Sequence, residues 1–116
     1  ETSEAPAVVL VHGMAGDRYD WNMLVDTLPD SLALLRYDLR GFGASTATDG
    51  VTFSHSDDLI AVLDAQGIDR AVLVGVSMGG AIVANTALNH PDRVSGLVLI
   101  SPGLICWLCG ASTCCQ

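Results

Sequence analysis

Apolar residues gather in four short runs along the chain: Ala7–Val11, Leu32–Tyr37, Ala71–Val74 and Gly96–Ile100. Each run is almost continuous in valine, leucine and isoleucine and shows no alternation with polar residues. This pattern is typical of strands that are buried on both faces of a parallel sheet. The runs therefore predict four β-strands.

Helical spacing of apolar residues fills the segments between these runs, and it predicts three helices, at Asp20–Leu28, Ser54–Gln66 and Met78–Asn89. Pro29 and Pro91 close the first and third helices, because proline cannot continue a helix. Ser54 with Asp57 three residues later fits a capping box for the second helix, and Gly67 suits a left-handed stop. The predicted order of elements is βαβαβαβ.

Right-handed crossovers between such strands predict a parallel sheet with helices on both faces, which is a three-layer αβα arrangement of the α/β class. In these sheets, reactive groups gather beyond the carboxyl ends of the strands. The candidate chemistry is therefore expected in the loops that follow Val11, Tyr37, Val74 and Ile100.

Composition limits the partners. The chain has 116 residues, half of them apolar, and a net charge of -8 from thirteen acidic residues against five arginines. This charge repels nucleic acid and anionic lipid, so neither a nucleic-acid partner nor a membrane partner is expected. No signal pattern and no apolar run of ~20 residues is present, which favours a cytoplasmic location.

The loop after the third run carries the strongest motif. Gly75-Val76-Ser77-Met78-Gly79 matches G-x-S-x-G between a predicted strand and a predicted helix. A serine on so tight a turn adopts strained backbone angles, and Gly75 and Gly79 must be small because they press against neighbouring backbone. Ser77 would stand at the amino end of a helix, where the dipole favours developing negative charge. A glycine-serine turn without a role is the alternative, but the context favours a nucleophile.

A second glycine-bearing loop, His12-Gly13-Met14-Ala15-Gly16, follows the first run. Acyl transfer needs two N–H donors aimed at the oxyanion, and the backbone amides of Met14 and Met78 are the candidates. For His12, a hydrogen-bonded structural role is favoured over that of a catalytic base.

The third loop reads Asp38-Leu39-Arg40-Gly41-Phe42-Gly43-Ala44-Ser45, which by itself fits a flexible turn held by an Asp38–Arg40 ion pair. Taken together in this order, the H-G-x-x-G, D-x-R-G-x-G-x-S and G-x-S-x-G motifs resemble the α/β-hydrolase superfamily. The segments around Asp57-Asp58-Leu59 and His90-Pro91-Asp92 are similar to its small esterase, enol-lactonase and haloperoxidase-like branch. The resemblance covers residues 6–103.

The resemblance implies a role for each matched residue. Ser77 would be the nucleophile, and Met14 and Met78 would be the oxyanion donors through their backbone N–H groups. The remaining motif positions would shape and brace the site: His12, Gly13, Gly16, Asp38, Arg40, Gly41, Gly43, Ser45, Gly75 and Gly79. The four strands would match the third to sixth strands of the family in the spatial order 4-3-5-6. The implied reaction is hydrolysis of a small carboxylic ester or lactone without a cofactor.

In the family, the acid and the histidine of the catalytic triad follow the nucleophile. After Ser77 the sequence offers only His90 and Asp92, and they lie beyond a helix about 18 Å long at 1.5 Å per residue. His55 follows a strand-end loop and could lie nearer to Ser77, but it is disfavoured as the base. We therefore expect an incomplete triad, a truncated chain and little turnover by this chain alone.

All four cysteines lie in residues 104–116, so residues 1–103 are interpreted as a partial hydrolase domain and 104–116 as a tail of doubtful origin. A metal centre is disfavoured because the adjacent Cys114 and Cys115 bind one ion only with difficulty, and disulfides are disfavoured in an otherwise cysteine-free chain. Unrelated sequence is the favoured explanation. The alternative function is a non-catalytic binding module that self-associates through the unprotected edge of its last strand.

Overall fold

The computed structural model describes residues 6–46, 50 and 52–101. The cysteine tail and its metal, disulfide and unrelated-sequence interpretations lie outside these residues. The strands are β1 (Ala7–Val11), β2 (Ala33–Tyr37), β3 (Ala71–Val76) and β4 (Val94–Ile100). The α-helices are α1 (Asn22–Thr27), α2 (His55–Ala65) and α3 (Met78–Asn89), and two 3-10 helices span η1 (Arg18–Trp21) and η2 (Pro91–Arg93).

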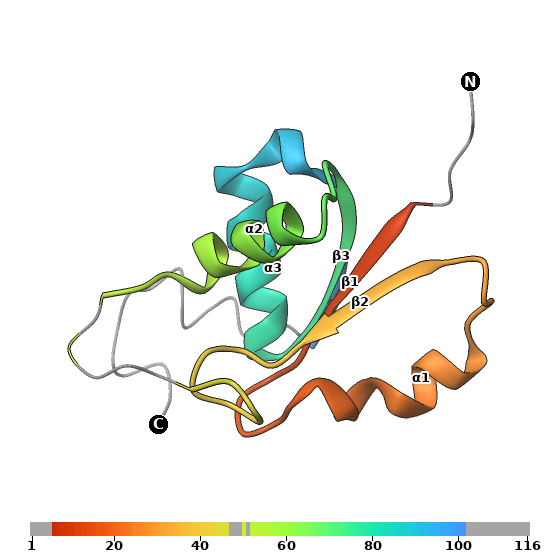
Figure 1. Ribbon diagram of the computed structural model, residues 1–116, viewed down its shortest axis with the longest axis horizontal. Coiled ribbons are helices and arrows are strands. Elements are labelled where there is room, and N and C mark those ends of the chain that lie inside the picture. The colour runs from red at the N-terminus through yellow and green to blue at the C-terminus, as the bar shows by residue number, and fades with distance from the viewer. Residues whose placement is uncertain (1–5, 47–49, 51, 102–116) are drawn as a thin grey trace.

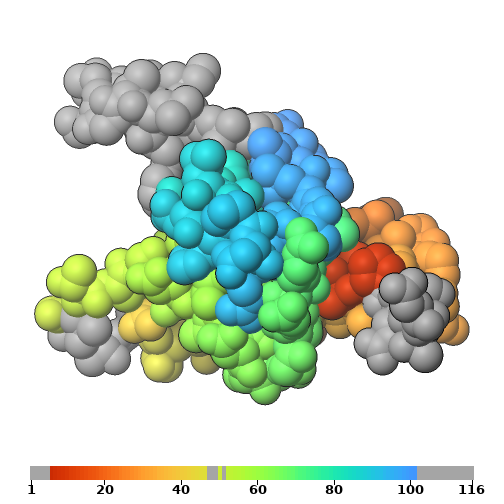
Figure 2. Space-filling view, turned by 90° about the horizontal axis from the view of Figure 1, so that it is seen from above, coloured from red at the N-terminus to blue at the C-terminus, as the bar shows by residue number. Residues whose placement is uncertain are grey.

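The four strands form one parallel sheet in the order β2-β1-β3-β4. This order confirms the predicted 4-3-5-6 arrangement, because β1 to β4 correspond to the third to sixth strands of that scheme. Helices α2 and α3 cover one face of the sheet and α1 lies on the other, which gives the three predicted layers (Figure 1). In the view from above, blue β4 and orange β2 lie on opposite sides of red β1 (Figure 2).

The strand register brings the carboxyl ends together at one edge. Val11 at the end of β1 pairs with Tyr37 on one side and with Gly75 on the other. The loops that follow β1, β2 and β3 therefore leave the sheet side by side, as parallel strands require.

Apolar packing holds both faces of the sheet. The larger cluster includes Val9, Val11 and Leu73 from the strands and Leu63 and Ile82 from α2 and α3. On the opposite face, Leu10 and Val74 pack with Trp21. Burial on both faces explains why the strand runs are continuous rather than alternating.

The first predicted helix, Asp20–Leu28, differs from the observed elements. The chain there forms η1 followed by α1, which ends at Thr27. The Asp17 side chain accepts a hydrogen bond from the Tyr19 amide at 2.8 Å, and the Asp20 side chain accepts one from the Asp17 amide at 3.3 Å. These bonds start a tight turn at Arg18, two residues before the predicted start.

Helix α2 begins and ends through local capping. The Ser54 hydroxyl accepts a hydrogen bond from the Asp57 amide at 3.3 Å. At the other end Gly67 has φ +68°, and the Ile68 amide donates to the Leu63 carbonyl at 2.9 Å. This left-handed stop is the one that the sequence predicted. Among the helices of the described residues, none is both long enough and apolar enough to span a bilayer.

Candidate active site

Ser77 occupies the sharp turn between β3 and α3. Its backbone angles are φ 54° and ψ -118°, a conformation that costs a non-glycine residue ~1–3 kcal/mol. The Ser77 amide donates to the Ile100 carbonyl at 3.0 Å, and the Gly80 amide donates to the Ser77 carbonyl at 2.9 Å. The residue is exposed, so its hydroxyl is accessible at the amino end of α3.

Two glycines permit this turn. A Cβ atom added at Gly75 would overlap the Gly79 carbonyl, and one added at Gly79 would overlap the Val11 and His12 carbonyls. Because every one of these neighbours is backbone, no side-chain rotation relieves the overlap. The close approach brings the start of α3 directly against the end of β1.

The loop after β1 passes beside Ser77. A Cβ atom added at Gly13 would lie 3.3 Å from the Ser77 Cβ and 3.9 Å from its Oγ. The Gly16 amide donates to the Gly13 carbonyl at 3.2 Å, which closes the loop into a turn. Within the described residues, neither the Met14 nor the Met78 amide donates a hydrogen bond. Neither amide therefore has an acceptor within the described part of the chain.

The His12 side chain is fully buried, and both of its ring nitrogens are occupied by backbone. Its Nδ1 donates to the Gly13 carbonyl at 2.8 Å, and its Nε2 accepts from the Leu39 amide at 2.9 Å. The second bond fixes the proton on Nδ1, since an N–H donor needs a lone pair at Nε2. The imidazole therefore braces two loops and has no free nitrogen for proton transfer.

Asp38 is buried at the end of β2 and pairs with Arg18. Its carboxylate accepts from the Arg18 amide at 2.7 Å, from the Arg18 guanidinium at 2.6 Å and from the Ala44 amide at 2.9 Å. The hydrogen bond from the Arg18 amide is the main cause that holds the pKa of Asp38 below its usual range, although burial opposes it. The Ser45 hydroxyl donates to the Asp38 carbonyl at 2.7 Å and closes the same loop.

The sequence suggested an ion pair between Asp38 and Arg40, but in the structure each of these residues pairs with another residue. Arg40 does not pair with Asp38; it forms a two-pronged ion pair with Asp58 of α2, at 2.9 and 2.6 Å. Arg18 and Asp58 were missed because they lie 20 and 18 residues from their partners. No local pattern signals such contacts.

Gly43 has φ +53°, and a Cβ atom there would overlap the Asp38 carboxylate, whereas Gly41 has φ +86° on the exposed part of the turn.

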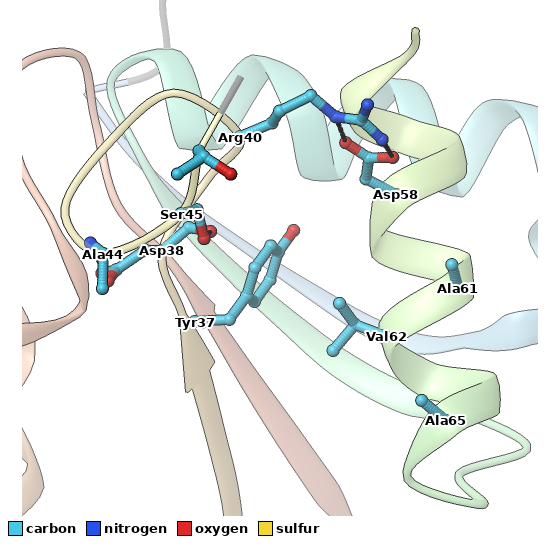
Figure 3. A pocket seen from close by; sticks show the side chains of 10 residues that line it. Tyr37, Asp38, Arg40, Ala44, Ser45, Asp58, Ala61, Val62 and Ala65 are labelled. Carbon is cyan, nitrogen blue, oxygen red and sulfur yellow. Dashed lines mark hydrogen bonds and ion pairs between the residues drawn. The ribbon is translucent and has the colours of Figure 1, made fainter. Parts of the chain in front are cut away.

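A groove of about 630 Å³ opens between this loop and α2, and the Arg40–Asp58 pair lies at its rim (Figure 3). The Tyr37 ring enters the groove, and its hydroxyl is buried without a hydrogen-bond partner among the described residues. Burial raises the pKa of Tyr37. Ser77, Gly13 and Met14 do not line this groove, so the groove is separate from the Ser77 turn.

Neither of the other two histidines hydrogen-bonds to Ser77. His90 follows the last turn of α3, where its Nε2 lies 3.8 Å from the Asp57 carboxylate. The His55 Nδ1 is buried without a partner in the described part of the chain, and burial lowers the pKa of this imidazole. Asp92 lies in η2, beyond the far end of α3. Within the residues that the structure describes, no group of three or more His, Cys, Asp or Glu side chains is placed to hold a metal ion.

Comparison with known proteins agrees with this geometry. The profile of the alpha/beta hydrolase fold family matches residues 6–109, so the chain belongs to that family. Over 100 residues it is 36% identical to the dihydrolipoyllysine-residue acetyltransferase component of the acetoin cleaving system of Cupriavidus necator, covering 84% of this chain and 27% of that protein.

A second relative is the pimeloyl-[acyl-carrier protein] methyl ester esterase of Yersinia enterocolitica, which is 33% identical over 94 residues, 81% of this chain and 35% of that protein. Among solved structures, Est816, described as an N-acyl homoserine lactone degrading enzyme, matches with a TM-score of 0.77. It is 34% identical, and the match covers 85% of this chain and 39% of that one. The chain thus spans about a third of the length of the curated relatives that it matches.

Proposed function

We propose that this chain carries the nucleophile of a serine hydrolase that acts on a carboxylic ester or lactone. The observation that carries the proposal is the exposed Ser77, which is held at φ 54° at the amino end of α3 and against Gly13. In this reaction the Ser77 Oγ attacks the carbonyl carbon and gives its proton to a base. The ester oxygen then leaves with a proton, and water hydrolyses the acyl-enzyme.

The amides of Met14 and Met78 are the proposed oxyanion donors. Both lie at the same edge of the sheet as Ser77, and neither is used by another described group. Donors that are fixed in place before the reaction stabilise the tetrahedral intermediate, and the loss of one typically costs ~3 kcal/mol of barrier. The positive end of α3 adds to this stabilisation.

The relatives support the substrate class. One is named a methyl ester esterase, and one solved structure is described as degrading an acyl homoserine lactone. Because neither His55 nor His90 hydrogen-bonds to Ser77, we expect slow turnover by the 116-residue chain alone. The base and the acid of the reaction are assigned to no described residue.

A fluorophosphonate probe tests the assignment, because it forms a covalent bond to a nucleophilic serine. After prolonged incubation of the chain, tandem mass spectrometry should find the label on Ser77, and Ser77→Ala should abolish it. Ser31→Ala is the matched control, since Ser31 is an exposed serine between α1 and β2 and should leave labelling unchanged. An unlabelled Ser77 in the folded chain, or undiminished labelling of Ser77→Ala, contradicts the proposal.

The exposed residues of β4 favour one other candidate function, self-association. Leu97, Val98 and Ile100 are 40%, 47% and 40% exposed, and β4 is an edge strand of the described sheet. Edge strands with apolar side chains pair readily with other chains. Sedimentation velocity should show a dimer that Val98→Lys converts to monomer, and a wild-type chain that stays monomeric at high concentration excludes this function. The cytoplasmic location, the absence of a nucleic-acid partner and the domain boundary at residue 103 stay predictions.

A further inference from the structure

The segments that follow β1 and β2 contain two arginines, and both are paired with aspartates. Arg18 binds the Asp38 carboxylate at 2.6 Å, and Arg40 binds the Asp58 carboxylate at 2.6 Å. The Arg40 guanidinium also lies over the Phe53 ring, 4.6 Å from its centroid. An ion pair carries no net charge, so neither arginine offers an unpaired positive charge to a negatively charged ligand.

Asp17 and Asp20 lie in the same part of the molecule without a positive partner. Within the described part of the chain, neither carboxylate takes part in an ion pair. Both accept hydrogen bonds from backbone amides instead: Asp17 from Tyr19 at 2.8 Å, and Asp20 from Asp17 at 3.3 Å. A backbone amide has no net charge, so the negative charges of these two side chains are not neutralised.

The Asp20 carboxylate lies beside the loop that contacts Ser77. A Cβ atom added at Gly16 would overlap this carboxylate. The Gly16 amide donates to the Gly13 carbonyl at 3.2 Å. A Cβ atom added at Gly13 would in turn lie 3.9 Å from the Ser77 Oγ. One tight turn therefore separates an unpaired negative charge from the proposed nucleophile.

The other three arginines do not offset this charge at the candidate active site. Arg36 of β2 donates to the Arg18 carbonyl at 3.2 Å and to the Asn22 side chain, so its guanidinium is held against η1 and α1. Arg70 and Arg93 directly precede β3 and β4, which places them at the amino-terminal edge of the sheet. The excess of negative charge at the carboxyl-terminal edge has the same sign as the net charge of -8.

We propose that this distribution of charge makes the Ser77 site selective against negatively charged substrates, so that its ester or lactone is uncharged or carries a cation. This inference rests on the proposed function, because it takes Ser77 as the nucleophile. A carboxylate-bearing ester would approach Asp17 and Asp20 without an unpaired arginine to receive it. Repulsion between like charges slows such an approach, and a cationic group on the ester would speed it.

Three fluorophosphonate probes of equal length test this preference. They end in a trimethylammonium group, in its uncharged tert-butyl isostere, or in a carboxylate. Initial rates of Ser77 labelling, measured by mass spectrometry at ~10 mM salt, should fall in that order, because the Debye length is then ~30 Å. The ratio of the trimethylammonium rate to the carboxylate rate should fall about tenfold when the salt is raised to ~1 M, where the Debye length is ~3 Å.

A pair of substitutions tests whether Asp17 and Asp20 are the source of the effect. The double variant Asp17→Asn/Asp20→Asn removes both charges, and the asparagine oxygens can still accept the same backbone hydrogen bonds. At ~0.1 M salt it should lower the rate ratio about two- to threefold. Asp26→Asn/Asp30→Asn is the matched control, since it removes two exposed charges from the end of α1 and the segment before β2. It should leave the ratio within about 1.3-fold of wild type, because charges beyond a Debye length are largely screened.

The outcomes separate this inference from the proposed function. If all three probes label Ser77 and the rate ratio does not change with salt, or if the carboxylate probe labels fastest at low salt, the charge preference is wrong and the nucleophile assignment stands. Equal ratios in the two double variants overturn the assignment to Asp17 and Asp20. If none of the probes labels Ser77 in the folded chain, the proposed function fails, and this inference fails with it.

Discussion

The His12 imidazole joins the loops that follow β1 and β2, because its Nε2 accepts the Leu39 amide proton across 2.9 Å. Both residues are fully buried, and the other ring nitrogen donates to the Gly13 carbonyl. One side chain thus fixes the loop that lies against Ser77 to the loop that begins with Asp38. The position of Gly13 beside the Ser77 hydroxyl depends on this link.

His12→Phe keeps a ring but leaves the Leu39 amide and the Gly13 carbonyl without their partner. We expect the free energy of unfolding to fall by ~2–4 kcal/mol, since each unsatisfied buried group costs ~1–3 kcal/mol. Urea unfolding followed by circular dichroism measures the change. The matched variant is His90→Phe, because His90 is partly exposed and makes only a long contact to Asp57. It should change stability by less than about 0.5 kcal/mol. Equal effects of the two variants would show that the His12 bonds do not stabilise the loops.

Gly75 and Gly79, on either side of the Ser77 turn, are required because they have no side chain. Gly75→Ala would drive a Cβ into the Gly79 carbonyl, and backbone cannot rotate away. We expect a loss of ~3 kcal/mol or more, or insoluble protein. Gly67→Ala is the control, because Gly67 has positive φ but no neighbouring atom within 4 Å. Its cost should be only ~1 kcal/mol of backbone strain. Thermal unfolding that ranks the two variants equally would refute the contact.

The helices, the strands and the Ser77 turn were predictable from sequence because their causes are local. Strands that are buried on both faces need continuous apolar runs. Gly75 and Gly79, two residues before and two after Ser77, stand where the backbone packs closely against other backbone. The partners of Asp38 and Arg40 were not predictable, because Arg18 and Asp58 reach them only after the chain has folded back across the sheet. The 3-10 turn at Arg18 was missed for a different reason. The spacing of apolar residues indicates that Trp21 is buried, but the polar cap at Asp17 determines where the turn starts.

The strained backbone at Ser77 predicts how substitutions there change the free energy of unfolding. At φ 54° any side chain is disfavoured, whereas glycine adopts positive φ freely. Ser77→Gly should therefore be more stable than Ser77→Ala by ~1 kcal/mol, although both remove the hydroxyl. At Ser31, where φ is not positive, the glycine variant should be no more stable than the alanine variant. Chemical unfolding of the four variants measures whether glycine is more stable than alanine at position 77 but not at position 31. If Ser77→Ala is more stable than Ser77→Gly, the result contradicts the strained turn.

Asp38 predicts how stability depends on pH. Its folded-state pKa is lowered, chiefly by the Arg18 amide, whereas an unfolded aspartate titrates near ~3.9. Ionised Asp38 therefore stabilises the fold fully at pH values above the unfolded pKa. This contribution is lost as the pH falls below ~3.9 and through the folded pKa, because the unfolded chain takes up the proton first.

Asp38→Asn should lower the free energy of unfolding by ~2 kcal/mol at pH 7, because it removes the charge that accepts the Arg18 and Ala44 hydrogen bonds. The gap between wild type and variant should narrow when urea unfolding is repeated below about pH 4. Asp30→Asn is the control, since Asp30 is exposed and accepts no hydrogen bond from a described residue. It should follow wild type at every pH. If the gap between wild type and Asp38→Asn stays constant with pH, the buried carboxylate is not the group whose protonation destabilises this edge of the sheet.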